Sequence, residues 1–124
     1  MDTLPQIYAS EPAMFNPDTG RLDAERIARE FNVPVATIAA AIRRKAAIVG
    51  KSPDASGFQG ELRRVYRIWV ALLALFAGDK TNIRIFLNAP NRNLENDAPI
   101  EFLRSGNLGP LELFVDAMSV RQPT

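Results

Sequence analysis

The sequence of 124 residues contains no cysteine and no histidine. Without cysteine the chain cannot form disulfides, thiolate metal sites or a cysteine nucleophile. Without histidine it lacks the commonest general base, the Ser-His-Asp triad and imidazole ligands for metals. Only carboxylates, lysine and tyrosine remain for catalysis. We therefore expect a protein that is not an enzyme and that binds no cofactor or metal.

Long hydrophobic runs are also lacking. The longest apolar run covers ten residues, 68–77, whereas a membrane-spanning helix needs about 20. The first five residues are acidic and interrupted by Pro5, so they lack the basic start and apolar core of a signal peptide. These features predict a cytoplasmic protein without membrane contact.

Charge is balanced over the whole chain but not along it. The net charge is +1, yet residues 43–67 carry seven basic side chains against two acidic ones. Such a local excess attracts phosphate groups, membrane headgroups or acidic proteins. A solvated helix face has the same composition, so both interpretations stay open. The seven are Arg43, Arg44, Lys45, Lys51, Arg63, Arg64 and Arg67.

The hydrophobic pattern is helical throughout, and no stretch shows sustained alternation of period two. Asp23 and Asn32 suit the start and end of a first helix, and Asp79 or Thr81 suits the start of a later one. The spacing predicts an all-α fold with helices over 23–31, 35–45, 61–77, 81–87, 99–105 and 110–120.

The composition along the chain suggests three parts. Residues 1–22 contain three prolines and are expected to form an irregular arm, followed by a small helix-turn-helix-like lobe over 23–50. The Gly-, Ser- and Pro-rich segment 50–60 predicts a linker, and residues 60–124 form a C-terminal helical bundle. We expect its core to be anchored by Trp69, Phe76, Phe86, Leu87 and Pro90, with a cost of about 3–5 kcal/mol for Trp69→Ala or Phe86→Ala.

Two helix-turn-helix registers compete in the N-terminal lobe. The first places the turn at Asn32, so that the second helix presents Val35, Ala36 and Ala40 with Thr37 beside them. The second places Arg43 at the turn, and its recognition helix is short because glycine and proline follow.

In either register the helix offers few donors to base edges, so DNA binding would depend on phosphate contacts. The candidate DNA-contacting residues are Thr37, Arg43, Arg44, Lys45 and Lys51.

The most acidic cluster is formed by Glu95, Asp97 and Glu101. It lacks the regular spacing of a calcium-binding loop. Asp97 is better explained as the cap of the helix that begins near Pro99.

The C-terminal half contains a recognisable order of residues. A helix ends at Phe76-Ala77-Gly78 and is followed by Phe86-Leu87-Asn88-Ala89-Pro90-Asn91, then Leu94, Pro99, Leu103, Gly106 and a last helix. Over residues 60–120 this order resembles the toxin-binding domain of the Xre/MbcA/ParS antitoxin family. Phe86 stands where that family usually has tryptophan, and Asn96 where glycine is common. Gly20-Arg21-Leu22 and the Ala-rich helices resemble, more weakly, the family's N-terminal Xre-like lobe.

The resemblance implies an antitoxin of a type II toxin–antitoxin system. Its partner would be a RES-domain toxin, which resembles ADP-ribosyltransferases and consumes NAD. The C-terminal part would cover the toxin's active site, and the N-terminal lobe would bind operator DNA as part of a homodimer and a larger toxin–antitoxin assembly. The candidate toxin contacts are Asn88, Asn91, Arg92, Asn93 and Arg121, although Asn91 also suits a role in shaping the turn.

Two other functions fit the same residues. One is a DNA-binding transcriptional regulator without a toxin partner, and the other is a dimeric interaction module that has lost DNA binding.

Overall fold

In the computed structural model, residues 10–121 are described, and they form seven α-helices and three short 3-10 helices without a β-strand. The predicted all-α fold is confirmed. The α-helices are α2 (Ala24–Phe31), α3 (Val35–Ala41), α4 (Ala46–Lys51), α5 (Gln59–Leu75), α6 (Lys80–Asn88), α7 (Ile100–Arg104) and α8 (Leu108–Arg121), and the 3-10 helices are η1 (Pro12–Met14), η2 (Ser56–Phe58) and η3 (Arg92–Leu94).

The helices begin and end where short-range chemistry favours it. The Asp23 carboxylate accepts hydrogen bonds from the backbone N–H groups of Glu25 and Arg26, and Asn32 closes α2 in the left-handed region. Asp79 caps α6 in the same way. Both caps agree with the prediction. The expected cap at Asp97 is wrong, because no side chain caps α7, which begins directly after Pro99.

One predicted helix is in fact two. The Ala-rich segment 35–45 breaks after Ala41, and α4 follows as a separate helix. The break contains Arg43 with φ +59°, a left-handed conformation in which a right-handed helix cannot continue.

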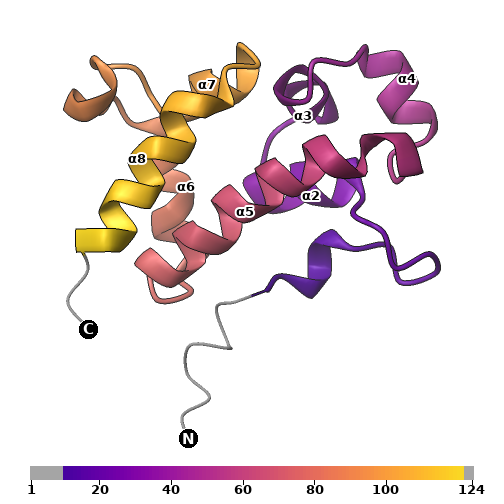
Figure 1. Cartoon of the computed structure of the whole chain (residues 1–124), viewed down its shortest axis with the longest axis horizontal. Helices are drawn as coiled ribbons and strands as arrows, with labels where there is room; N and C mark the ends of the chain where they lie inside the picture. The colour runs from indigo at the N-terminus through magenta and orange to yellow at the C-terminus, as the bar shows by residue number, and fades with distance from the viewer. Residues whose placement is uncertain (1–9, 122–124) are drawn as a thin grey trace, which may run out of the picture.

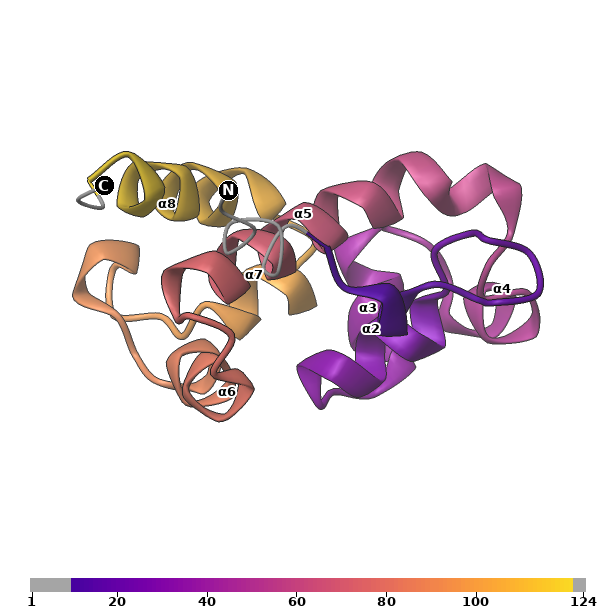
Figure 2. The ribbon, with the colours of Figure 1, turned by 90° about the horizontal axis from the view of Figure 1, so that it is seen from below.

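The longest helix, α5, extends along both halves of the molecule (Figures 1 and 2). On one side α2, α3, α4 and η1 pack together, and on the other α8 and α6 pack on α5. The halves also meet directly, because α3 lies against α7. The apolar residues of α5 that face these neighbours are buried, namely Leu62, Val65, Ile68, Trp69, Leu72 and Leu73.

The segment 11–22, predicted as part of an irregular arm, contributes buried residues to the core. Met14 and Leu22 are fully buried, and the two sides of this turn are tied by an isolated bridge between Phe15 and Leu22. The remainder of the predicted arm, residues 1–9, lies outside the described residues.

The segment predicted as a linker is held by hydrogen bonds to the N-terminal half. The carbonyl of Pro53 accepts from the backbone N–H of Ala24, and the Asp54 carboxylate accepts from the Thr19 hydroxyl at 2.8 Å. The Gln59 amide exchanges two hydrogen bonds of 2.9 Å with the backbone of Leu22. The segment 50–60 is therefore a fixed part of the structure, formed by the end of α4, a turn, η2 and the start of α5, and not a flexible linker.

A cluster of charged and aromatic side chains joins the N-terminal segment to α2, α5 and α6. Glu11, only 7% exposed, accepts a hydrogen bond from Trp69 Nε1 at 3.0 Å. Lys80 Nζ lies 3.0 Å from Glu11 and 2.8 Å from Glu30. Burial lowers the pKa of Lys80, but the hydrogen bonds to Glu30 and Glu11 outweigh it and keep the pKa above its ordinary value.

The predicted core anchors are only partly confirmed. Trp69 and Leu87 are fully buried, and Trp69 packs on Phe31 with ring centroids 4.8 Å apart. Phe76 and Phe86 are half-buried and lie against each other at the edge of the core. Pro90 is exposed, which corrects its assignment to the core. It follows the extended residue Ala89 at the end of α6, a conformation that proline imposes on the residue before it.

These burials predict unequal costs of truncation. Trp69→Ala should lower the free energy of unfolding by about 3–5 kcal/mol, because it removes a buried ring and leaves the Glu11 carboxylate without its indole donor. Phe86→Ala should cost only about 1–2 kcal/mol, because a half-buried ring keeps less apolar area away from water. Urea unfolding of both variants is followed by circular dichroism, because Trp69 is the single tryptophan and its replacement removes the indole fluorescence signal. Equal losses of stability for the two variants would contradict this packing.

Candidate functional site

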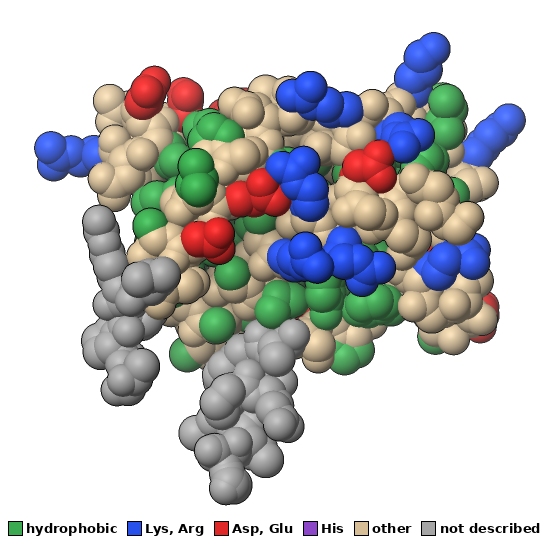
Figure 3. All heavy atoms as spheres, in the orientation of Figure 1, with side chains coloured by type: hydrophobic (Ala, Val, Ile, Leu, Met, Phe, Trp, Pro, Cys, Tyr) green, Lys and Arg blue, Asp and Glu red, His purple; other side chains and the backbone are tan. Residues whose placement is uncertain are grey.

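Two surfaces of the molecule differ in charge. Lys and Arg side chains gather over α4 and the start of α5, whereas Asp and Glu side chains surround exposed hydrophobic ones over α8 (Figure 3). The first of these surfaces, with the seven basic side chains of residues 43–67, is called here the basic surface.

On the basic surface, α4 is the exposed helix. Val49 is fully buried, but its neighbours in α4, including Ile48 and Lys51, are exposed. This arrangement matches the second helix-turn-helix register, in which α3 precedes the turn at Arg43 and α4 follows it. In the first register the second helix is α3, which packs on α7; of the residues that it would present, Ala36 is exposed, and Val35 and Ala40 are half-buried. Thr37 of α3 is 8% exposed, so its assignment to a DNA-contacting surface is corrected.

Two of the predicted phosphate-binding arginines are engaged within the protein. Arg43 Nε donates to the carbonyl of Gly106 at 2.8 Å. Arg44 lies over the ring of Phe58 and pairs with Glu61 at 2.8 Å. The hydrogen bond from Arg44 lowers the pKa of Glu61.

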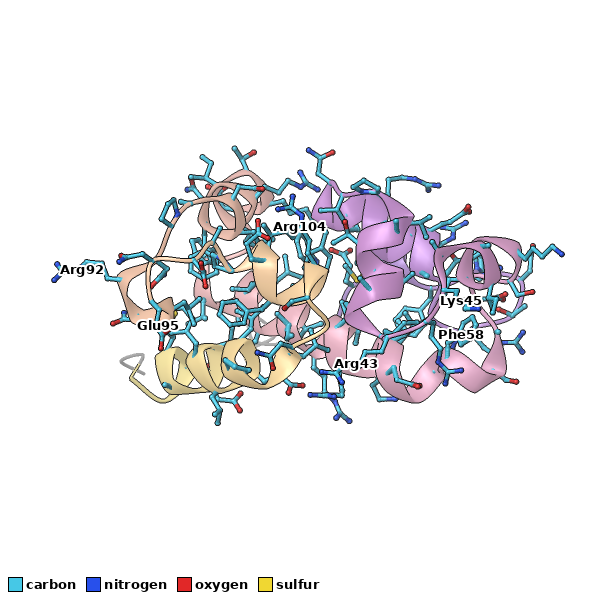
Figure 4. The ribbon with its side chains drawn as sticks, turned by 90° about the horizontal axis from the view of Figure 1, so that it is seen from above. Arg43, Lys45, Phe58, Arg92, Glu95 and Arg104 are labelled. Carbon is cyan, nitrogen blue, oxygen red and sulfur yellow. The ribbon has the colours of Figure 1, made fainter. Side chains whose placement is uncertain are left out.

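The remaining cations of the basic surface are less engaged. Lys45, Lys51, Arg63 and Arg67 are exposed, and no carboxylate of residues 10–121 lies within ion-pair distance of them. Figure 4 shows Lys45 and Phe58 on the α4 side of the molecule, whereas Arg43 lies at the junction of the two halves. Lys45 is the N-cap of α4, and Lys51 is its last residue.

The second surface is a groove between η3, α7 and α8. A recess of about 610 Å³ is lined by Asn93, Leu94, Glu95, Asp97, Phe102, Asn107, Pro110, Leu113 and Phe114. It continues into a recess of about 540 Å³ that shares Asp97, Phe102 and Asn107 and adds Glu101 and Ser105. Together these two recesses are called here the α7–α8 groove.

Leu113 is the most exposed large hydrophobic side chain among the described residues, at 72%. It belongs to both the α7–α8 groove and a separate recess of about 470 Å³ on the other side of α8. In this separate recess Arg64 donates two hydrogen bonds of 3.0 and 2.7 Å to Glu112, and this pairing raises the pKa of Arg64.

The predicted toxin contacts are not all available. Asn88 donates to the carbonyl of Arg84, and the Asn91 side chain accepts from the N–H of Asn93 at 2.9 Å, which confirms its role in shaping the turn. Arg92 extends away from the rest of the chain (Figure 4). Asn93 is exposed and lines the α7–α8 groove. The side chain of Arg121 lies outside the described residues.

Leu113 and Phe102 were missed by the sequence reasoning. A signal for Leu113 was present, since helical spacing in the last helix places Leu111, Phe114, Val115 and Met118 on an inward face that leaves out Leu113. Phe102 carries no such signal, because its half-burial depends on how α7 meets α8.

Comparison with known proteins adds no family to this description, since no family model, no curated protein and no solved structure matches the chain. Among the helices of residues 10–121, none is both long and apolar enough to cross a membrane. Within the same range, no group of three or more acidic side chains is arranged to hold a metal ion.

Gly106 lies where the turn between α7 and α8 packs against the end of α3. Gly106 has φ +69°, and a Cβ atom there would lie 2.7 Å from the carbonyl oxygen of Ala40 and 3.1 Å from Cγ of Arg43. The backbone of the turn between α7 and α8 thus rests on the end of α3, beside the turn that precedes α4.

We predict that Gly106→Ala lowers the free energy of unfolding by about 1–3 kcal/mol, because it adds left-handed strain and a backbone clash. Gly109→Ala is the matched control. Gly109 is helical with nothing within 4 Å of a Cβ atom, so alanine there should be neutral or stabilising by up to about 1 kcal/mol. Urea unfolding of both variants checks the junction, and a Gly106→Ala protein as stable as wild type would show that α3 and α7 do not meet this closely.

Proposed function

We propose that this chain is the antitoxin of a type II toxin–antitoxin pair. Its C-terminal half binds a RES-type, NAD-consuming toxin and blocks access to the toxin's active site by steric occlusion, without chemistry of its own. The observation that carries the proposal is Leu113, a large apolar side chain 72% exposed beside a recess lined by two phenylalanines. The residue order from Phe76 to Gly106, which resembles the family's toxin-binding domain, supports the same half of the chain.

The physical basis is apolar burial. Covering an exposed leucine fully is worth about 1.5–3 kcal/mol, and stable interfaces bury about 1,200–2,000 Å² in total. The α7–α8 groove, with the η3 turn beside it, offers a continuous surface on which a partner can make such contact. The core residues of α5 depend on α2 and the N-terminal segment, so the experiment uses the full chain.

We expect Leu113→Arg to weaken the complex with the cognate RES-type toxin by at least tenfold, and to abolish rescue of growth on co-expression. The change places a charge in an apolar contact. Ile85→Arg is the matched control, because Ile85 on α6 is 61% exposed and lines neither recess beside α8. Affinity measured by biolayer interferometry and growth rescue should be unaffected by the control. A wild-type chain that neither binds nor neutralises that protein would overturn the proposed function.

We propose further that the basic surface binds operator DNA, with a homodimer presenting two α4 helices to successive turns of the duplex. The observation that favours this is the exposure of α4 between Lys45 and Lys51. The helix itself carries alanine, isoleucine and glycine at its exposed positions, so phosphate contacts and DNA shape supply most of the binding.

Replacing Lys45 and Lys51 together by alanine should weaken binding to operator and random DNA alike. The slope of log affinity against log salt should become shallower by roughly 0.9 for each phosphate that the variant no longer neutralises. Arg92→Ala is the control, since Arg92 is equally exposed but lies in η3 of the other half. Mobility-shift titrations over a range of salt concentrations measure the slope. If wild-type protein fails to retard its promoter fragment at low salt, alone or with the toxin, the DNA-binding part is wrong.

A further inference from the structure

We infer that the α7–α8 groove receives a basic–apolar segment of the protein partner, in which lysine or arginine stands beside a large apolar side chain. This inference rests on the proposed function and names the chemistry of the surface that the antitoxin recognises.

The apolar part of the groove accounts for the apolar side chain. Leu113, Phe114 and Pro110 of α8 face Phe102 of α7 across the recess. The ring of Phe114 stacks on Phe86 with centroids 6.0 Å apart, so the apolar side of the groove packs on α6. Asn93 and Asn107 lie at the edges, where their amides can bond the backbone of an extended segment.

The charges that line the groove are all acidic. Glu95, Asp97 and Glu101 line the two recesses that form it, and no lysine or arginine does. Glu101 is paired with Arg104 in α7. Glu95 and Asp97 are exposed, and no cation of residues 10–121 lies within ion-pair distance of them. Two uncompensated carboxylates beside an apolar floor favour a cationic partner group and repel an acidic one.

The backbone of the turn that carries Glu95 and Asp97 is ordered by hydrogen bonds. Glu95 ends η3 in the left-handed region at φ +57°. The N–H groups of Asn96 and Asp97 bond the carbonyls of Asn91 and Leu94 at 2.9 and 3.0 Å, and the N–H of Asn91 bonds the carbonyl of Asp97 at 3.1 Å. Figure 4 shows Glu95 beside α8, on the opposite side of the η3 turn from the outward-pointing Arg92. A turn whose backbone is ordered before binding loses little backbone freedom when a partner arrives.

The recess on the other side of Leu113 differs in this respect. Its lining has two arginines and two carboxylates, and Arg64 is already paired with Glu112. The basic surface would repel the same partner segment. Charge therefore directs a basic–apolar segment to the α7–α8 groove and leaves α4 uncovered.

The test compares charge reversals in the full chain. The variant Glu95→Lys/Asp97→Lys is matched by Asp18→Lys/Glu25→Lys, which gives the same net charge at exposed sites of the N-terminal half. Each protein is titrated with the cognate RES-type toxin, at low and high salt. We expect the groove variant to bind at least tenfold more weakly at low salt, mainly through slower association, with a difference that shrinks as salt rises. The control should bind within about twofold of wild type.

Three results would overturn the inference. If both reversals weaken binding equally, only net charge matters. If neither reversal does while Leu113→Arg still prevents binding, the groove is used without a cation, and the proposed function survives on its own. If the wild-type chain is a dimer that Leu113→Arg converts to a monomer, a second copy occupies the groove. Absence of any wild-type complex is distinct from these results, because it removes the proposed function as well.

Discussion

The position of Lys80 between Glu11 and Glu30 is the constraint on which the arrangement of the two halves depends. Its ammonium group pairs with one carboxylate from the N-terminal segment and one from α2, while the Trp69 indole donates to Glu11. Because Glu11 is almost fully buried, loss of either partner would leave a charge in an apolar setting, which is strongly unfavourable. Arg84, one turn after Lys80, adds two hydrogen bonds of 2.9 and 2.7 Å to the carbonyl of Glu30. Helix α6 is thereby held to α2 by side chains of opposite charge.

Much of the helical framework could be predicted from local chemistry. Asp23, Asn32 and Asp79 act through atoms within four residues of themselves, so their roles are visible in the sequence. The break at Arg43 was not, because arginine has no intrinsic preference for the left-handed region. Its conformation accompanies a hydrogen bond to Gly106, 63 residues away. The burial of Met14 and Leu22 also depends on partners that are distant in sequence, and composition alone suggested an irregular arm.

The functional surfaces show the same division. The excess of positive charge in residues 43–67 is plain from the sequence, but which of those cations are paired depends on Glu61 and Glu112, whose positions relative to Arg44 and Arg64 follow from helix packing. The α7–α8 groove could not be predicted because its lining comes from three elements. Leu113 alone gave a signal, as an apolar residue outside the inward face of its helix.

The sharing of α5 between the halves has a consequence for the lifetime of the chain. Trp69 packs on Phe31 of α2, while the same helix packs on α8, so neither half keeps a closed core when the other opens. Small proteins of this kind unfold in one all-or-none transition. A protease that captures an open form at any point therefore gains access to the entire chain. A partner bound only to the native state at one end protects the opposite end equally, by a free energy that grows with the logarithm of its concentration. Occupancy of one surface thus sets the degradation rate of the other.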